Sequence, residues 1–147
     1  MLRLLLLLLL VPSCVNPYQS AHATIAVGRG ALALSDFGFI FYLGVEKQKC
    51  QDKCKAEPAC VAKCMGPQNR IKMGFEQGKR VAGSSFDLAD AIVNAAEKEN
   101  KKEFTDWEPV VKRAACVVAR LLVFSPPDIK KQVNDLLFAL ARYGCNK

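Results

Sequence analysis

The sequence predicts an all-α fold, a small disulfide-stapled bundle of four or five helices. Apolar residues recur at helical spacing in several segments, whereas no segment shows a convincing strand pattern. The chain has seven cysteines, and four of them fall within residues 50–64. Apart from this cluster there is no internal repeat, and no linker divides the chain. We therefore expect residues 24–147 to form one helical domain.

The first 23 residues are typical of a secretory signal peptide. Arg3 supplies a positive charge, residues 4–11 form an unbroken apolar run, and Ala21-His22-Ala23 matches the small-x-small pattern that signal peptidase accepts. The apolar run is too short to cross a bilayer, which takes about 20 residues. We therefore expect residues 1–23 to be removed as a signal peptide and the product to be secreted and extracellular.

Cleavage after Ala23 would change the set of reactive side chains. Removal of Cys14 leaves an even number of cysteines, which suits a disulfide framework made by Cys50, Cys54, Cys60, Cys64, Cys116 and Cys145. A lipoprotein signal with Cys14 lipidated is the alternative, and the proline at position 12 disfavours it. Removal of His22, the only histidine, excludes Ser-His-Asp and Cys-His catalysis and histidine-containing zinc sites. Since no catalytic motif is present, the sequence predicts a non-enzymatic protein with no cofactor and no metal.

Residues 24–45 are apolar and rich in Gly and Phe, with Arg29 and Asp36 as the only charged residues. The favoured interpretation is a buried central element, because a domain this small needs such a core. The alternative is a segment that contacts a membrane or an apolar ligand. Its candidate contact residues are Phe37, Phe39, Ile40, Phe41 and Tyr42. A glycine pattern at 28–33 resembles the dinucleotide fingerprint by chance, because no strand–helix series surrounds it.

The stretch CQDKCKAEPACVAKC, residues 50–64, predicts two short helices. Residues 47–55 are charged and readily helical, and Pro58 suits the first position of a helix that ends at Met65. Cysteines four residues apart lie on one helical face, so each helix presents a pair. Thiols couple in an oxidising compartment, which favours disulfides over a four-thiolate zinc site.

Two pairing arrangements remain open for this cluster. A nested pairing, Cys50–Cys64 with Cys54–Cys60, would join the two helices as a hairpin, and the spacing resembles the twin C-x3-C hairpins of some venom peptides, seed peptides and small mitochondrial chaperones. That pairing would leave Cys116 to Cys145, which lie about 16 Å apart if their helices fold back on each other. The sequence therefore slightly favours an arrangement in which both of these cysteines reach back to the cluster.

The remainder of the chain predicts a loop or short helix followed by three helices. Residues 66–83 are rich in Gly and basic residues and are expected to form a loop or a short helix. Ser84 with Asp87 forms a capping box for a helix with a charged far end, and Thr105 with Glu108 forms another for a helix ending at Phe124. A last helix is expected after an N-cap at Ser125, with a stop at Gly144. The expected apolar faces comprise Phe86, Ala89, Ile92, Val93 and Ala96, then Val110, Val111, Ala114, Val117, Val118, Leu121 and Leu122, then Ile129, Val133, Leu136, Leu137 and Leu140.

Charge is the remaining clue to function. The chain has 21 basic and 14 acidic residues and a formal net charge of +7, which falls to +6 if the leader with Arg3 is removed. Such a charge favours partners such as anionic lipid or another polyanionic surface. No nucleic-acid motif is present, so no nucleic-acid partner is expected. The favoured function is a secreted, cationic, defence-like or toxin-like effector that acts by binding, at anionic membranes.

Two alternative functions come from other classes. The broad apolar helix faces could enclose a small apolar ligand, which would make the protein an extracellular carrier. The sequence Gly78-Lys79-Arg80 resembles the cleavage and amidation signal of secreted peptide precursors, which would make the chain a precursor. A phosphate loop at residues 74–80 is rejected because the spacing is one residue short and no Ser or Thr follows the lysine.

Overall fold

The computed structural model describes residues 16–101, 103–124 and 126–140 and confirms the all-α class. The described residues contain α-helices and one short 3-10 helix, and no strand lies among them. The elements are α2 (Pro17–Lys53), α3 (Pro58–Cys64), α4 (Gly66–Lys98), α5 (Glu108–Leu121), the 3-10 helix η1 (Leu122–Phe124) and α6 (Pro127–Leu140).

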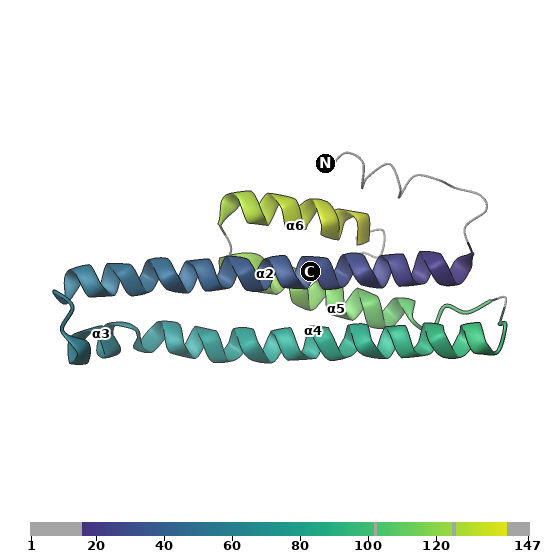
Figure 1. The fold of residues 1–147 in the computed structure, drawn as a ribbon, viewed down its shortest axis with the longest axis horizontal. Coiled ribbons are helices and arrows are strands. Elements are labelled where there is room, and N and C mark those ends of the chain that lie inside the picture. Colours follow the sequence, from purple (N-terminus) through teal and green to yellow (C-terminus); the bar gives the residue numbers. More distant parts are fainter. Residues whose placement is uncertain (1–15, 102, 125, 141–147) are drawn as a thin grey trace.

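The two longest helices, α2 and α4, run antiparallel along the length of the molecule, and α3 joins them at one end (Figure 1). Helix α5 packs against both of them near the opposite end. Helix α6 packs mainly against α2 and only to a smaller extent against α5 (Figure 1). The end of the hairpin that carries α3 therefore extends beyond α5 and α6 (Figure 1).

Helix α2 starts well before the predicted cleavage position. It begins at Pro17, and the Asn16 side chain caps it by accepting a hydrogen bond from the backbone N–H of Tyr18 at 3.0 Å. The helix continues without interruption through Ala23 to Lys53. The helix expected at 47–55 is thus the last part of a much longer helix.

The main core forms where α2, α4 and α5 meet, and a glycine permits their close approach. Ile25, Phe86 and Val118 are fully or almost fully buried in it. A Cβ atom at Gly28 would overlap the ring of Phe86, so α2 can lie this close to α4 only because residue 28 has no side chain. Gly28 therefore has a packing role.

The segment 66–83, expected as a loop or short helix, belongs to one long helix, and the capping box expected at Ser84 is wrong. Residues 66–83 form the first half of α4, and Ser84 lies inside the helix, where its hydroxyl donates to the Arg80 carbonyl at 2.9 Å. A Cβ at Gly78 would lie 2.9 Å from Cδ2 of Leu121, so this glycine makes room for α5. Tertiary packing overrides the low helical propensity of the glycines here.

Helix α5 agrees with the prediction except at its first turn. It starts at Glu108 after Trp107, which makes no side-chain cap hydrogen bond, so the capping box expected from Thr105 is wrong. Val111, Ala114 and Val118 are buried as expected, and the helical region ends at Phe124 through η1. Ser125, the predicted N-cap of the last helix, and Gly144, its predicted stop, lie outside the described residues.

An ion pair between Asp36 and Lys79 joins the middle of α2 to α4 at 2.8 Å. The hydrogen bond that Lys79 donates to the Asp36 carboxylate raises the pKa of Lys79 above its ordinary value. Because the pKa is higher in the folded protein than in the unfolded chain, this pair stabilises the fold below about pH 10.5, and the stabilisation is lost as the pH rises through the raised pKa.

We expect Asp36→Asn to lower the free energy of unfolding by about 0.5–1 kcal/mol at pH 7, because the pair is partly exposed and solvent screens it. The difference between the variant and the original protein should shrink as the pH rises through the raised pKa of Lys79. Urea unfolding at pH 7 and pH 11.5 measures both values. A difference that stays constant between the two pH values would show that Lys79 is not the group involved.

Candidate functional site

The apolar segment of α2 divides between a buried face and an exposed face. Phe39 is buried and stacks on Phe75 of α4, with ring centroids 3.9 Å apart, and Tyr42 packs against the same small cluster. Phe37, Ile40 and Phe41 instead expose 62%, 62% and 55% of their surface. Of the five candidate contact residues, the structure thus places two toward the core and three toward solvent.

Val45 extends the exposed group along the same side of the helix. It is 39% exposed and lies four residues after Phe41, which itself lies four residues after Phe37, so the side chains are neighbours on one helical face. We call Phe37, Ile40, Phe41 and Val45 the α2 patch. Gly44 is also exposed within this stretch, and a Cβ there would meet nothing within 4 Å.

The charged residues of the apolar segment point away from the α2 patch. Arg29 pairs with Asp87 of α4 at 2.8 Å, and Asp36 pairs with Lys79 of α4. Both charged side chains therefore form ion pairs between α2 and α4. The exposed residues of α2 between positions 37 and 45 are all uncharged.

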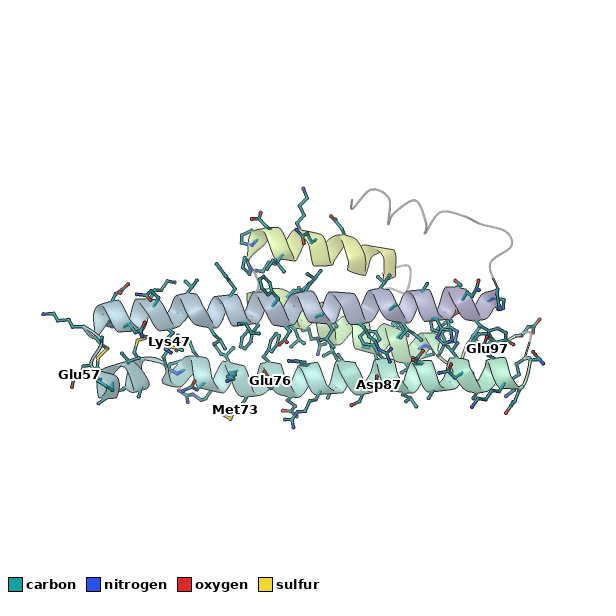
Figure 2. All side chains as sticks on the ribbon, viewed as in Figure 1. Lys47, Glu57, Met73, Glu76, Asp87 and Glu97 are labelled. Carbon is teal, nitrogen blue, oxygen red and sulfur yellow. A yellow bond between two sulfur atoms is a disulfide. The ribbon has the colours of Figure 1, made fainter. Side chains whose placement is uncertain are left out.

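Other exposed large apolar residues do not form a comparable group on the described surface. Met73, Val81 and Leu88 of α4 are similarly exposed, but they are seven or eight residues apart, and the remaining one, Val123, lies on η1. Met73 points away from α2 (Figure 2). Isolated exposed apolar residues are common on soluble proteins, whereas adjacent ones mark contact sites.

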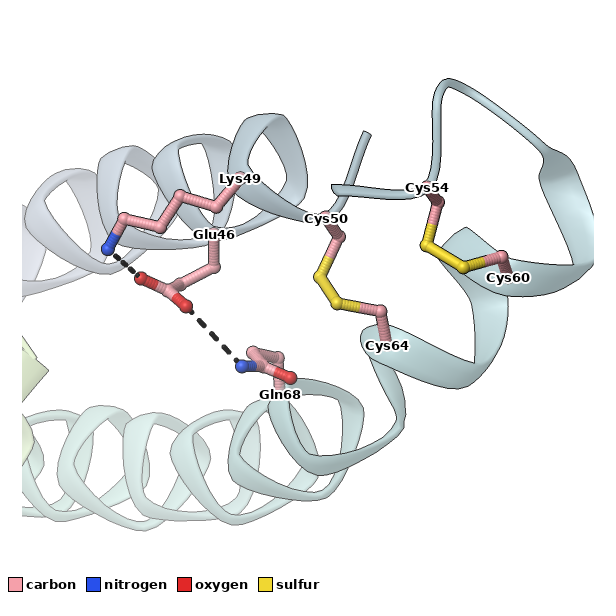
Figure 3. Close-up of a disulfide and its surroundings, with 7 residues drawn as sticks. All are labelled: Glu46, Lys49, Cys50, Cys54, Cys60, Cys64 and Gln68. Atoms are coloured by element: carbon pink, nitrogen blue, oxygen red, sulfur yellow. Dashed lines mark hydrogen bonds and ion pairs between the residues drawn. A yellow bond between two sulfur atoms is a disulfide. The ribbon is translucent and has the colours of Figure 1, made fainter. Parts of the chain in front are cut away.

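Two nested disulfides close the end of the hairpin beyond the α2 patch (Figure 3). Cys50 pairs with Cys64 and Cys54 with Cys60, with Cα–Cα distances of 5.8 and 5.6 Å. The reach-back arrangement favoured by the sequence is therefore wrong. It assumed that the last two helices fold along each other, whereas α6 packs mainly on α2.

Cys116 is also disulfide-bonded, and it does not use any of the four cysteines at the tip, because these pair with one another. Cys14 and Cys145 both lie outside the described residues.

The turn between α2 and α3 has an unusual backbone. Lys55 and Ala56 adopt positive φ angles of 49° and 61°, and the Ala56 N–H donates to the Gln51 carbonyl at 2.9 Å. Left-handed conformations are costly for residues with a side chain, so the surrounding structure must hold them. The Cys54–Cys60 disulfide encloses both residues and fixes this turn.

The disulfide-closed end also concentrates positive charge. Residues 46–72, which we call the cationic tip, contain seven basic and three acidic residues, a formal net charge of +4. All the basic side chains are exposed, namely Lys47, Lys49, Lys53, Lys55, Lys63, Arg70 and Lys72. The tip therefore carries more than half of the net charge of the chain in 27 of its 147 residues.

Glu46 organises the boundary between the α2 patch and the cationic tip. Its carboxylate accepts from Lys49 at 2.7 Å and lies 3.5 Å from the Gln68 amide nitrogen of α4 (Figure 3). The hydrogen bond to Glu46 and the charge of Glu46 raise the pKa of Lys49 above its ordinary value. Glu46 is the least exposed of the three acidic groups in the tip, so it offsets little of the outward positive charge.

The cationic tip was not predicted, because only the net charge of the whole chain was considered at that point. Counting charge between residues 46 and 72 would have revealed it, since the cysteine spacing already predicted that this segment turns back on itself. Val45 was not predicted either, although it continues the helical spacing of Phe37 and Phe41.

Gly78-Lys79-Arg80, the predicted processing signal, lies in the middle of α4. Lys79 is paired there with Asp36. Protease access would require local unfolding of the helix.

By length and composition alone, α2 is long and apolar enough to cross a membrane, although a third of its most apolar window is buried inside the protein. The described residues hold no group of three His, Cys, Asp or Glu side chains that could bind a metal ion. One open pocket of about 570 Å³ lies between the start of α2 and the segment before α5, and Glu103, Asp106 and Glu108 are among its lining residues.

No protein-family model, curated protein or solved structure matches this chain, so the geometry of the α2 patch and the cationic tip carries the functional argument.

Proposed function

We propose that the protein is a secreted, non-enzymatic effector that binds anionic membrane surfaces through the α2 patch and the cationic tip. The observation that carries this proposal is the adjacency of the two features on one end of the hairpin. Phe37, Ile40 and Phe41 are more than half exposed, and the basic residues of the tip begin two residues after Val45.

The apolar contribution can be estimated from the exposed surface. Complete burial of a Phe or Ile side chain is worth about 1.5–3 kcal/mol, so burying the exposed half of one such side chain contributes about 1 kcal/mol. The three large residues of the α2 patch together contribute about 3 kcal/mol on this basis. Such a contribution alone gives only weak, reversible binding.

Electrostatic attraction supplies the second contribution. A basic residue close to an anionic bilayer contributes about 1 kcal/mol, and a net charge of +4 at the tip adds a comparable amount to the apolar part. Lys47 and Lys49 follow the α2 patch directly and can keep their ammonium groups at headgroup level while the aromatic side chains enter the interface. Two weak signals together are what stable attachment to a membrane surface requires.

The proposal places α2 in the plane of the interface and not across the bilayer. If α2 crossed the bilayer, the pairs Arg29–Asp87 and Asp36–Lys79 would have to enter the hydrocarbon together with α4 or be broken. A helix lying in the interface exposes one apolar face to lipid and keeps its charged residues on the other side, as α2 does here.

Two disulfides and an N-terminal apolar helix fit a secreted protein. In this proposal the two disulfides keep the cationic tip folded outside the cell, and the helices form one small disulfide-linked bundle. The carrier and precursor functions remain alternatives. The described pocket is lined by three carboxylates, which suit a polar or cationic molecule better than an apolar ligand.

Co-sedimentation with vesicles tests the proposal. The purified secreted protein is mixed with vesicles of phosphatidylcholine alone and with vesicles that contain phosphatidylserine. We expect clear binding to the anionic vesicles, weak binding to the neutral ones, and a loss of affinity as salt rises from 50 to 500 mM because the charges are screened. Equal binding to both kinds of vesicle, or no binding to either, would contradict the proposal, and a dimer at the same concentrations would assign the α2 patch to self-association.

A further inference from the structure

We infer that residues 17–23 stay in the mature protein, and that any leader is cut ahead of Pro17 and not after Ala23. This inference concerns a processing position and does not depend on membrane binding. It comes from the contacts that this first segment of α2 makes with the end of α4 and the loop after it.

Tyr18 ties the start of α2 to the end of α4. Its hydroxyl donates to the Lys101 carbonyl at 2.7 Å and lies 3.3 Å from the Ala96 carbonyl oxygen, and its ring stacks on Phe104 with centroids 4.9 Å apart. Lys101 follows the end of α4, so the Tyr18 hydroxyl gives its carbonyl a partner within the protein, while the Ala96 carbonyl also accepts from the Lys101 N–H at 3.0 Å.

The next turn of α2 also packs against the core and contacts α4. Ala21 is 0% exposed and belongs to the main core cluster. His22 places Nδ1 2.8 Å from a carboxylate oxygen of Asp90 and Nε2 3.8 Å from a carboxylate oxygen of Glu97, both on α4. Residues 17–23 thus contribute an aromatic stack, a buried alanine and polar contacts to one end of the hairpin.

A chain cut after Ala23 would lose all of these contacts. Its new ammonium group would lie on Thr24, directly beside Ile25, which is 1% exposed in the core. The cap that Asn16 provides to the helix would also be absent. Signal peptidase acts on the unfolded chain, so burial does not protect the bond itself. The reason for the inference is the stability of the folded product, because the contacts of Tyr18, Ala21 and His22 form only if α2 begins at Pro17.

Retention has a chemical consequence. The mature protein would keep His22, its only histidine, held between two carboxylates. The exclusion of histidine chemistry, which followed from cleavage after Ala23, would then no longer apply to the secreted protein.

N-terminal sequencing and the intact mass of the protein secreted by cells that express the full chain test this inference. We expect an N-terminus at residue 17 or earlier, with residues 17–23 present in the mass. An N-terminus at Thr24, or at any residue from 18 to 23, would overturn the inference. Neither result affects the vesicle experiment, because the α2 patch and the cationic tip lie beyond residue 24 in both products.

Two matched variants provide a second readout. A substitution in a segment that is removed cannot change the melting temperature of the secreted product. We expect Tyr18→Ala to lower the melting temperature by about 5–10 °C and Gln19→Ala, at an exposed neighbouring position, to leave it within about 1 °C. Identical melting temperatures for Tyr18→Ala and the original protein would overturn the inference.

Discussion

Replacing Phe37, Ile40 and Phe41 together by serine is expected to weaken binding to anionic vesicles by about 100-fold. The reason is the loss of about 3 kcal/mol of apolar transfer from the α2 patch, and each 1.4 kcal/mol corresponds to a factor of ten in affinity. The free energy of unfolding should change little, because these side chains are mostly exposed in the free protein. Titration of the variant with phosphatidylserine vesicles measures the effect.

The matched control replaces Met73, Val81 and Leu88 by serine. These residues are 67%, 51% and 55% exposed on α4, so the control removes a similar amount of exposed apolar surface without touching the α2 patch. We expect its affinity for anionic vesicles to change by less than about 3-fold. If both triple variants lost affinity equally, general surface hydrophobicity would explain the binding, and the α2 patch would have no special role.

Gly28→Ala is expected to destabilise the fold by about 2–3 kcal/mol. The added methyl group would overlap the ring of Phe86, which is 0% exposed in the core. Helices α2 and α4 would have to separate locally, which would disturb the core that they share with α5. Urea unfolding at pH 7 measures the change.

Gly30→Ala is the matched control for this prediction. The substitution is the same and lies two residues further along α2, but a Cβ at Gly30 meets nothing within 4 Å. Because alanine favours a helix over glycine, we expect this variant to gain about 0.5–1 kcal/mol of stability. Destabilisation of similar size in both variants would contradict the close approach of α2 and α4 at Gly28.

Local signals in the sequence predicted the class of the fold and several element boundaries. Pro58 begins α3 as expected, and the apolar spacing of Val111, Ala114 and Val118 identified the buried face of α5. A proline at a first helical position and an apolar stripe act within a few residues, so both can be recognised from the sequence alone.

Contacts between distant segments account for the elements that sequence reasoning did not predict. Glycines at 74, 78 and 83 indicated a loop or a short helix, whereas the long helix α4 runs through all three positions. At Gly78 the missing side chain makes room for Leu121. Ser84 has the composition of an N-cap, but its hydroxyl bonds back within the helix. A sequence pattern cannot show which glycines face a neighbouring helix.

The candidate site could be predicted in part. Residues 37–42 were identified as the contact segment from composition, but periodicity alone did not separate Phe39 from Phe41. The position of α4 separates them, because it covers the face that carries Phe39 and leaves the opposite face open. The cationic tip required the turn between α2 and α3, which brings basic residues from both sides of the cysteine cluster to one end of the molecule.

The measurement that tests membrane binding by the α2 patch most directly is quenching of a single tryptophan by brominated lipid. Trp107 is buried and is first replaced by phenylalanine, and then Phe41→Trp and Val81→Trp are made separately in that background. On anionic vesicles with brominated acyl chains, the fluorescence of the tryptophan at position 41 should shift to the blue and be strongly quenched, while that at position 81 stays unchanged. Quenching at position 81 equal to or greater than at position 41 would show that another face meets the membrane.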